Sequence, residues 1–276
     1  MKRFFFVTIV ICFMSPLLSN HLSAQDPPID MYINSWKNSL PEVSHGTMVE
    51  RAILMPGDVN HPSRPGAVLT FAKKFARGLL ESYVQTTPTK HTGEEEILYI
   101  MKGRGRIEAG LKKAELIEGT GVLIPPDVEH TIINENSEPL EMLVLVDDFP
   151  ASKVPPKEIV VKNYHSLPVS AGGHWCHIAR SLFSQGDGMG GFYSILLVSV
   201  DGMNIPEPHP HGTGDEEGWC AIKGRSLLFL GKEIRWQDEG TAFIIPQDAK
   251  TPHSNINPGN DPVMFFYFRT FKKLEK

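Results

Sequence analysis

Residues 102–127 read KGRGRIEAGLKKAELIEGTGVLIPPD, and residues 223–248 read KGRSLLFLGKEIRWQDEGTAFIIPQD. Aligned without a gap at an offset of 121 residues, the two stretches are identical at ten of 26 positions. Most of these identities are glycines, prolines and turn residues, which restrict backbone geometry. Just upstream, Thr92-Gly93 and Glu95-Glu96 match Thr213-Gly214 and Glu216-Glu217 at the same offset. The chain therefore contains two copies of one folding unit.

Both copies are built from short β-favouring runs separated by glycine and proline. The clearest runs are Ile97–Met101, Gly121–Ile124, Ser226–Leu230 and Ala242–Ile245. Closely spaced strands with this punctuation predict an all-β sandwich or barrel. The apolar pattern breaks around the prolines at 155 and 156, which places one unit at residues 25–154 and the other at residues 155–276.

The first 24 residues have the layout of a secretory signal peptide. Lys2 and Arg3 precede an apolar run from Phe4 to Leu18, and a polar segment ends in Ser23-Ala24. A membrane span needs about 20 apolar residues, so this run is short for one, although a retained N-terminal anchor is the alternative. We therefore predict a secreted or periplasmic protein that begins near Gln25 and has no membrane attachment after cleavage.

Composition excludes several classes of function. The formal net charge is −5, and losing the two cations of residues 1–24 makes it −7. No basic stripe with interleaved aromatic residues is present, so no nucleic-acid partner is expected. The sequence also has no glycine-rich phosphate loop, no Gly-x-Ser-x-Gly and no Cys-x-x-Cys pair. Cys176 and Cys220 either pair in an oxidising compartment or remain as buried thiols.

Candidate metal ligands gather in the second copy. His209 and His211 are two residues apart, Glu217 follows a glycine-containing turn, and His253 lies about 40 residues further on. On a strand, residues two apart lie on one face, so His209 and His211 present both imidazoles together. Imidazole and carboxylate ligands suit one divalent transition metal such as iron, manganese, zinc, nickel or copper.

These residues resemble the motifs of the cupin family. The match comprises His209, His211, Glu217 and Gly224, then Gly240, Pro246, His253 and Asn257. The resemblance implies two cupin barrels, each a double-stranded β-helix or jelly roll, and a metal held by His209, His211, Glu217 and His253. The sequence departs from the motif in having one extra residue before Glu217 and two before His253. The first departure leaves Glu216 as a rival ligand, but Glu217 keeps the seven-residue step to Gly224 that Glu96 makes to Gly103.

The first copy matches the same motifs less completely. His91, Glu96 and His130 occupy ligand positions, but Thr89 stands where the first histidine is expected. A two-histidine, one-carboxylate set is a known ligand group for iron. The first copy is therefore either a second metal site or a barrel kept only for packing.

Other side chains are candidates for the substrate pocket of the second copy. Counting by two from Glu217 puts Trp219 on the ligand face, where it either stacks on a substrate ring or is core. His174 and His177 either line the pocket and carry protons or are surface and structural residues.

The resemblance implies a metal-dependent bicupin enzyme, the layout of residues 1–24 predicts that it is exported, and the complete ligand set predicts a working site in the second copy. Its substrate would be an organic acid, a sugar acid or an aromatic molecule, and its reaction that of a dioxygenase, decarboxylase or isomerase. Glu217 would be the catalytic residue, acting as a ligand or as a base. A non-catalytic cupin that binds a metal or a small ligand is the alternative, and homo-oligomers are possible.

Overall fold

The computed structural model describes residues 28–171 and 173–271, so the predicted signal peptide lies outside the described residues. In those ranges the regular elements are β-strands and 3-10 turns, which confirms the all-β prediction. The four 3-10 turns are η1 (Ile29–Met31), η2 (Trp36–Asn38), η3 (Tyr164–Ser166) and η4 (Gln185–Asp187). None of the helices among the described residues is long and apolar enough to cross a membrane.

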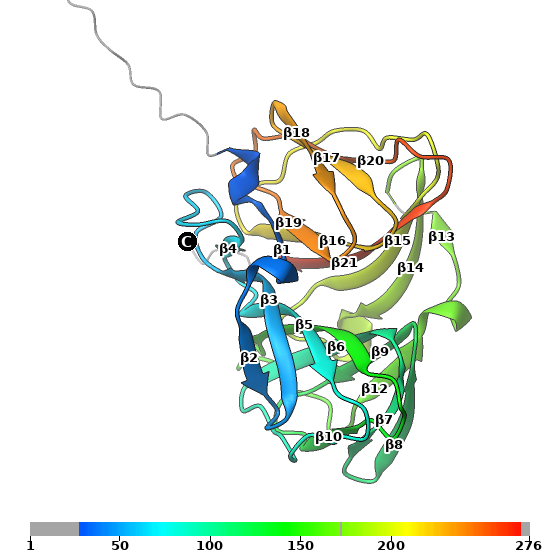
Figure 1. The fold of residues 1–276 in the computed structure, drawn as a ribbon. Coiled ribbons are helices and arrows are strands. Elements are labelled where there is room, and N and C mark those ends of the chain that lie inside the picture. The colour runs from blue at the N-terminus through cyan, green and yellow to red at the C-terminus, as the bar shows by residue number, and fades with distance from the viewer. Residues whose placement is uncertain (1–27, 172, 272–276) are drawn as a thin grey trace, which may run out of the picture.

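The first barrel is a jelly roll made of one large and one small sheet, and it occupies the lower half of Figure 1. The small sheet has the order β10 (His130–Ile133), β7 (Arg104–Ala109), β8 (Lys112–Ile117). β4 (Ala67–Leu69) pairs in parallel with β3. The large sheet runs in the order β12 (Val160–Asn163), β9 (Thr120–Ile124), β6 (Glu94–Lys102), β11 (Leu140–Asp148), β5 (Lys74–Leu80), β3 (Met48–Pro56), β2 (Pro41–Ser44).

The second barrel repeats this plan in the upper half of Figure 1. Its small sheet has the order β18 (Glu233–Gln237), β17 (Ser226–Leu230), β20 (His253–Ile256). Its large sheet has the order β1 (Ile33–Ser35), β19 (Thr241–Ile244), β16 (Asp215–Lys223), β21 (Val263–Phe271), β15 (Ser194–Val200), β14 (His177–Ser184), β13 (Ser170–Ala171). Each strand thus has a counterpart in the first barrel, as the duplication predicts.

The two large sheets exchange one strand each. β1, near the N-terminus, pairs antiparallel with β19 of the second barrel, with Ile33 opposite Phe243. β12, which follows the boundary predicted at 154/155, pairs with β9 of the first barrel, with Val160 opposite Leu123. The barrels are consequently joined by backbone hydrogen bonds in both directions.

Aromatic side chains form the core between the two sheets. The rings of Phe75 and Phe266 stack at a centroid distance of 5.9 Å, and Tyr99 lies 5.5 Å from Phe266. Because side chains alternate along a strand, the neighbours of these residues point the other way, into the barrels. Glu96 of β6 and Glu217 of β16 both occupy such inward positions.

Candidate metal centres

The second barrel brings three histidines together. His209, His211 and His253 each offer one ligand atom, and these atoms lie within 4.8 Å of one another. His209 and His253 face each other in an isolated β-bridge, which brings the loop before β16 to the start of β20. The Nδ1 atom of each ring already has a partner: the Glu207 carbonyl at 3.2 Å, the Asp215 carboxylate at 2.7 Å and the His209 carbonyl at 2.8 Å, respectively. The Nε2 atoms therefore remain for a metal.

Glu217 lies directly beside this histidine group. Its Oε1 is 3.3 Å from Nε2 of His253, and its Oε2 is 3.5 Å from Nε2 of His211. Two side chains also donate to the same carboxylate, the indole N–H of Trp219 at 2.7 Å and the hydroxyl of Tyr267 at 2.9 Å. Burial opposes ionisation of Glu217, but the contacts with His253, His211 and Trp219 prevail and hold its pKa below the usual range.

Asp215 and Arg269 orient the ring of His211. Asp215 accepts from His211 Nδ1 at 2.7 Å and from two guanidinium nitrogens of Arg269 at 2.6 Å each. Burial lowers the pKa of His211, but the hydrogen bond to Asp215 and the charges of Glu217 and Asp215 together outweigh it and raise that pKa. A carboxylate on the far nitrogen of a ligating histidine fixes its tautomer and increases its basicity.

Glu216, the rival ligand, faces away from the histidines. Its carboxylate accepts three consecutive backbone N–H groups of the first barrel, those of Thr70 at 2.5 Å, Phe71 at 3.0 Å and Ala72 at 2.8 Å. Because neighbouring residues on a strand point to opposite faces, only Glu217 can reach the interior of the second barrel.

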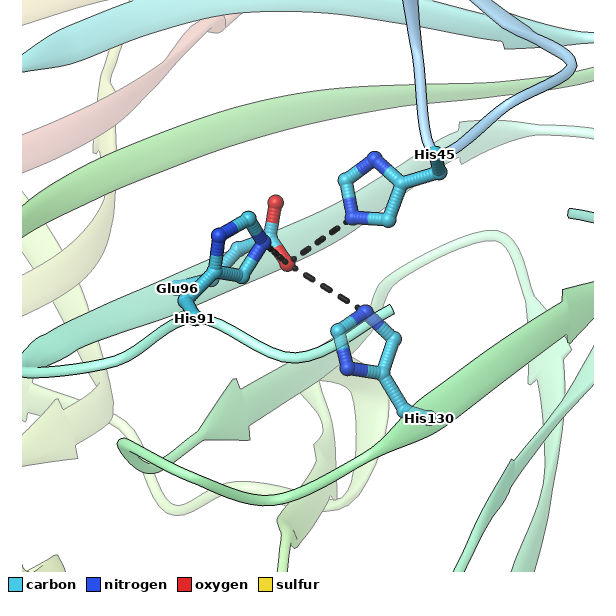
Figure 2. A group of neighbouring side chains, drawn as sticks. All are labelled: His45, His91, Glu96 and His130. Atoms are coloured by element: carbon cyan, nitrogen blue, oxygen red, sulfur yellow. Dashed lines mark hydrogen bonds and ion pairs between the residues drawn. The ribbon is translucent and has the colours of Figure 1, made fainter. Parts of the chain in front are cut away.

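The first barrel holds a complete group of three histidines and one glutamate (Figure 2). Nε2 of His45, His91 and His130 lies 3.3, 3.4 and 3.4 Å, respectively, from the same oxygen of Glu96. The glutamate is fully buried, and among the histidines His91 is the one that is partly exposed. Burial opposes ionisation of Glu96, but the imidazoles of His130, His45 and His91 hold its pKa well below the usual range.

His45 fills the ligand position that the motif leaves empty. Thr89 forms an isolated β-bridge with His130, as His209 does with His253, so Thr89 is the spatial counterpart of His209. Its hydroxyl donates to the Thr87 carbonyl at 3.0 Å. His45 reaches Glu96 from the other side, at the tip of the β2–β3 hairpin, where it has a φ of 48°. The first barrel, which the motif leaves one imidazole short, thus gains its third histidine from outside the motif.

Both groups fit a metal ion. Metal–ligand bonds of about 2.0–2.1 Å at tetrahedral angles put neighbouring ligand atoms about 3.3 Å apart. The contacts around Glu96 have this length, which is long for hydrogen bonds between these groups. Within the described residues Nε2 of His91, Nε2 of His130 and Oε1 of Glu96 have no hydrogen-bond partner, and the same is true of Nε2 of His211. Buried polar atoms left without partners are costly, and a bound cation would satisfy them.

Sequence reasoning missed His45 because the residue lies outside the repeated segment. It stands 46 positions before His91, on a hairpin for which the repeat gives no alignment. One signal was available, since a threonine in a ligand position invites a search for another histidine upstream. His45 is followed by Gly46, which has a φ of 78°, and two successive residues with positive φ form a tight turn.

Trp219, His174 and His177 lie together in the second barrel. The ring of Trp219 is 4.8 Å from that of Tyr267 and 5.5 Å from that of His177. The ring of His174 is 4.7 Å from that of His177 and 4.8 Å from that of His209. Cys176 and Cys220 are both buried free thiols, so they do not pair.

Comparisons with known proteins agree with this architecture. Residues 81–146 match the family model described as "Cupin domain". The fold is that of a two-barrel cupin. A 71-residue stretch is 41% identical to an uncharacterized protein of Methanocaldococcus jannaschii, covering 26% of this chain and 57% of that relative. The chain thus spans little more than half the length of the curated relative that it matches.

Solved structures resemble nearly the whole chain in fold. The putative glyoxylate-induced protein from Pseudomonas aeruginosa aligns with a TM-score of 0.73 and 12% identity, over 93% of this chain and 95% of that one. Oxalate decarboxylase of Lactobacillus farciminis, solved as a formate complex, aligns with a TM-score of 0.64 and 13% identity, over 89% of this chain and 90% of that one. At these identities the likeness concerns the fold alone.

Proposed function

We propose that this bicupin is a metal-dependent enzyme that acts on a small organic acid in its second barrel, and that the first barrel binds a second metal ion. The observation that carries the proposal is a difference in what surrounds the two ligand groups. The same sheet positions carry aliphatic side chains around Glu96 and polar aromatic or charged side chains around Glu217.

The strand registers make this comparison direct. In the first barrel Glu96 pairs with Val146, and Leu98 pairs with Val144. In the second barrel the corresponding pairs are Glu217 with Arg269 and Trp219 with Tyr267. Leu98, Val144 and Val146 can only fill space, whereas Trp219, Tyr267 and Arg269 supply hydrogen-bond donors and a positive charge. The second barrel therefore has the side chains that catalysis on a polar molecule needs.

These side chains have distinct roles in the proposal. A bound metal would act as a Lewis acid that receives a substrate carboxylate oxygen. Tyr267 is buried next to the Glu217 carboxylate, and both effects raise its pKa, so its hydroxyl stays protonated and donates to Glu217. Trp219 holds the other oxygen of Glu217. Glu217, kept ionised and fixed between these donors, would supply the anionic ligand of that metal.

The structural neighbours support an acid as the substrate class. The similar structure from L. farciminis is an oxalate decarboxylase bound to formate, so a fold of this kind can host a small carboxylate. The sequence identity to that enzyme is 13%, so a small carboxylate is a proposal for the substrate class of this chain.

Metal content and turnover in two variants test the proposal. Metal-replete protein would be assayed by mass spectrometry for metal and by dioxygen uptake and carbon dioxide release on oxalate, glycolate and related acids. We expect two metal ions per chain, loss of one in His45→Ala with turnover retained, and loss of the other in His211→Ala with turnover abolished. Turnover that disappears in His45→Ala but survives in His211→Ala would assign the chemistry to the first barrel and contradict the proposal. Bound metal without turnover on any acid would favour the non-catalytic binding protein.

We also propose that the chain is exported, from the order of charged, apolar and small residues in positions 1–24. N-terminal sequencing of the protein recovered outside the cytoplasm should then find a start near Gln25. An intact Met1 on that material would contradict the proposal.

A further inference from the structure

The edge hairpins of the two large sheets are counterparts that carry histidines at their tips. β2 and β3 end the sheet of the first barrel, and β13 and β14 end that of the second. Ser44 pairs with Met48, so the first tip contains His45. Ala171 pairs with Ile178, so the second tip contains His174 and His177. The duplication thus puts imidazoles at corresponding places beside both ligand groups.

The histidines of the two hairpin tips differ in their relation to the ligand groups. In the first barrel His45 completes the group, because Thr89 stands at the position that forms the isolated β-bridge. In the second barrel His209 already occupies that position and lies within the ligand group. The tip histidines of the second barrel are therefore additional to a group of three imidazoles and Glu217. His174 has a charged neighbour, because a carboxylate oxygen of Glu207 lies 3.1 Å from its Nδ1, whereas His177 is the more buried of the two.

His177 is buried with an unpaired nitrogen. The residue is 8% exposed, and its Nε2 has no hydrogen-bond partner among residues 28–171 and 173–271. It occupies an inward position of β14, two residues before the buried Ala179, and its ring contacts Trp219. Leaving such a buried atom unpaired is unfavourable, so a bound molecule that supplied the partner would be stabilised there.

The surroundings of His177 favour the neutral imidazole. Burial, aided by the neighbouring His174, lowers the pKa of His177 to about 4. Neutral imidazole has one N–H donor and one acceptor nitrogen, so it can bind a hydroxyl, a carbonyl or a carboxylate. His177 contacts two neighbours of the ligand group, His174, whose ring lies 4.8 Å from that of His209, and Trp219, which donates to Glu217.

We propose that His177 binds the second oxygen-bearing group of an acid whose first carboxylate lies at the metal position of the second barrel. The substrate class is then small acids with two adjacent oxygen functions, such as dicarboxylates and 2-hydroxy acids, rather than simple monocarboxylates. This inference rests on the proposed function and refines its substrate.

Calorimetric titration with matched acids tests the role of His177. Oxalate and glycolate represent acids with two oxygen functions, and formate and acetate represent acids with one. The titrations would use metal-replete protein in the His45→Ala background, so that the metal of the second barrel is the one observed. In this background we expect oxalate and glycolate to bind at least about tenfold more tightly than formate and acetate, since hydrogen bonds to charged groups are strong ones.

Apolar substitutions at His177 should remove this selectivity. His177→Phe and His177→Leu should weaken oxalate and glycolate at least about tenfold while formate and acetate change little, with metal content unchanged. His61→Phe is the matched control, because His61 is an exposed histidine that contacts Asp58 and belongs to neither ligand group. Unchanged oxalate binding in either metal-replete variant would overturn the inference. Loss of metal from both variants would overturn it too, because His177 would then support the ligand group itself.

The outcome is separable from that of the proposed function. Selective binding without turnover would retain the role of His177 and reject the enzyme. Turnover with equal affinity for oxalate and formate would retain the enzyme and reject this role for His177.

Discussion

Glu95 and Glu216 make the same contact in opposite directions across the two barrels. Glu95 accepts the backbone N–H groups of Gly190 at 2.8 Å, Gly191 at 2.8 Å and Phe192 at 3.1 Å in the second barrel. Glu216, 121 residues later, accepts three consecutive N–H groups in the first barrel. Each is followed in the chain by a glutamate that faces a ligand group, Glu96 or Glu217. In each barrel one carboxylate therefore contacts the other barrel and the next one contacts the histidines.

Removing either of these contacts should destabilise the pair of barrels. Glu95→Ala leaves three N–H groups without their acceptor, and we expect the free energy of unfolding to fall by about 2–3 kcal/mol. Glu94→Ala is the control, because Glu94 forms an exposed ion pair with Lys73 that is worth about 0–1 kcal/mol. Urea unfolding of both variants measures the difference. Equal stability of the two would show that the contact of Glu95 contributes nothing.

The third histidine of the first barrel should be transferable from the hairpin tip to position 89. His45→Ala should lose one metal ion per chain, because the group drops to two imidazoles and Glu96. Adding Thr89→His should restore that ion, since Thr89 occupies the position that His209 has in the second barrel. Metal content by mass spectrometry gives the answer. If the double variant stays at one ion, Thr89 does not point toward the ligand group.

The carboxylates next to the Nδ1 atoms of His211 and His45 should affect metal affinity to different extents. Asp215→Asn removes the charge between His211 and Arg269, and we expect the metal affinity of the second barrel to fall about 10–100-fold. Glu50→Gln should affect the first barrel less, because the Glu50 oxygen is 3.9 Å from His45 Nδ1 whereas the Ser44 hydroxyl is at 2.6 Å. Competition with a chromophoric chelator measures both affinities. A larger loss in Glu50→Gln would contradict this ranking.

His177 should make the metal-free protein less stable in acid. Its pKa is about 4 when folded and about 6.5 when unfolded, so between these values the unfolded chain binds more protons. The contribution of His177 is therefore fully present above pH 6.5 and is lost as the pH falls toward 4, up to about 3 kcal/mol. Chelator-treated wild type and His177→Leu would be unfolded in urea from pH 4 to pH 8. The wild type should lose more stability than the variant as the pH falls, and parallel curves would argue against a buried neutral imidazole.

Part of the ligand set could be predicted because it depends on local rules. The two-residue spacing of His209 and His211 predicted that both imidazoles lie together, and they do, although both residues lie in the loop before β16 and not on a strand as expected. Glu217 keeps its distance to a turn glycine. Both spacings can be recognised in a single sequence without a structure. The repeat extended the same reasoning to His91, Glu96 and His130.

The rest depends on contacts between distant segments. His45 reaches Glu96 through a hairpin tip, which no spacing in the repeat encodes. Glu216 and Glu217 differ in function only because one faces the other barrel, and the loop that it contacts lies 144 to 146 residues away. The exchanged strands β1 and β12 belong to the same class, since their partners lie across the predicted boundary.

The strand exchange also sets the order in which the chain can be completed during synthesis. Ile33 cannot pair with Phe243 until Phe243 has been synthesised. Phe243 is added 210 residues later, which takes about 10–40 s at usual elongation rates. Until then β1 has no partner, and β9 has an open edge until β12 is made. Open edges are templates for strands of other chains, so the half-finished protein is exposed to misassembly. A gene cut between the barrels would make this exposure permanent in both products.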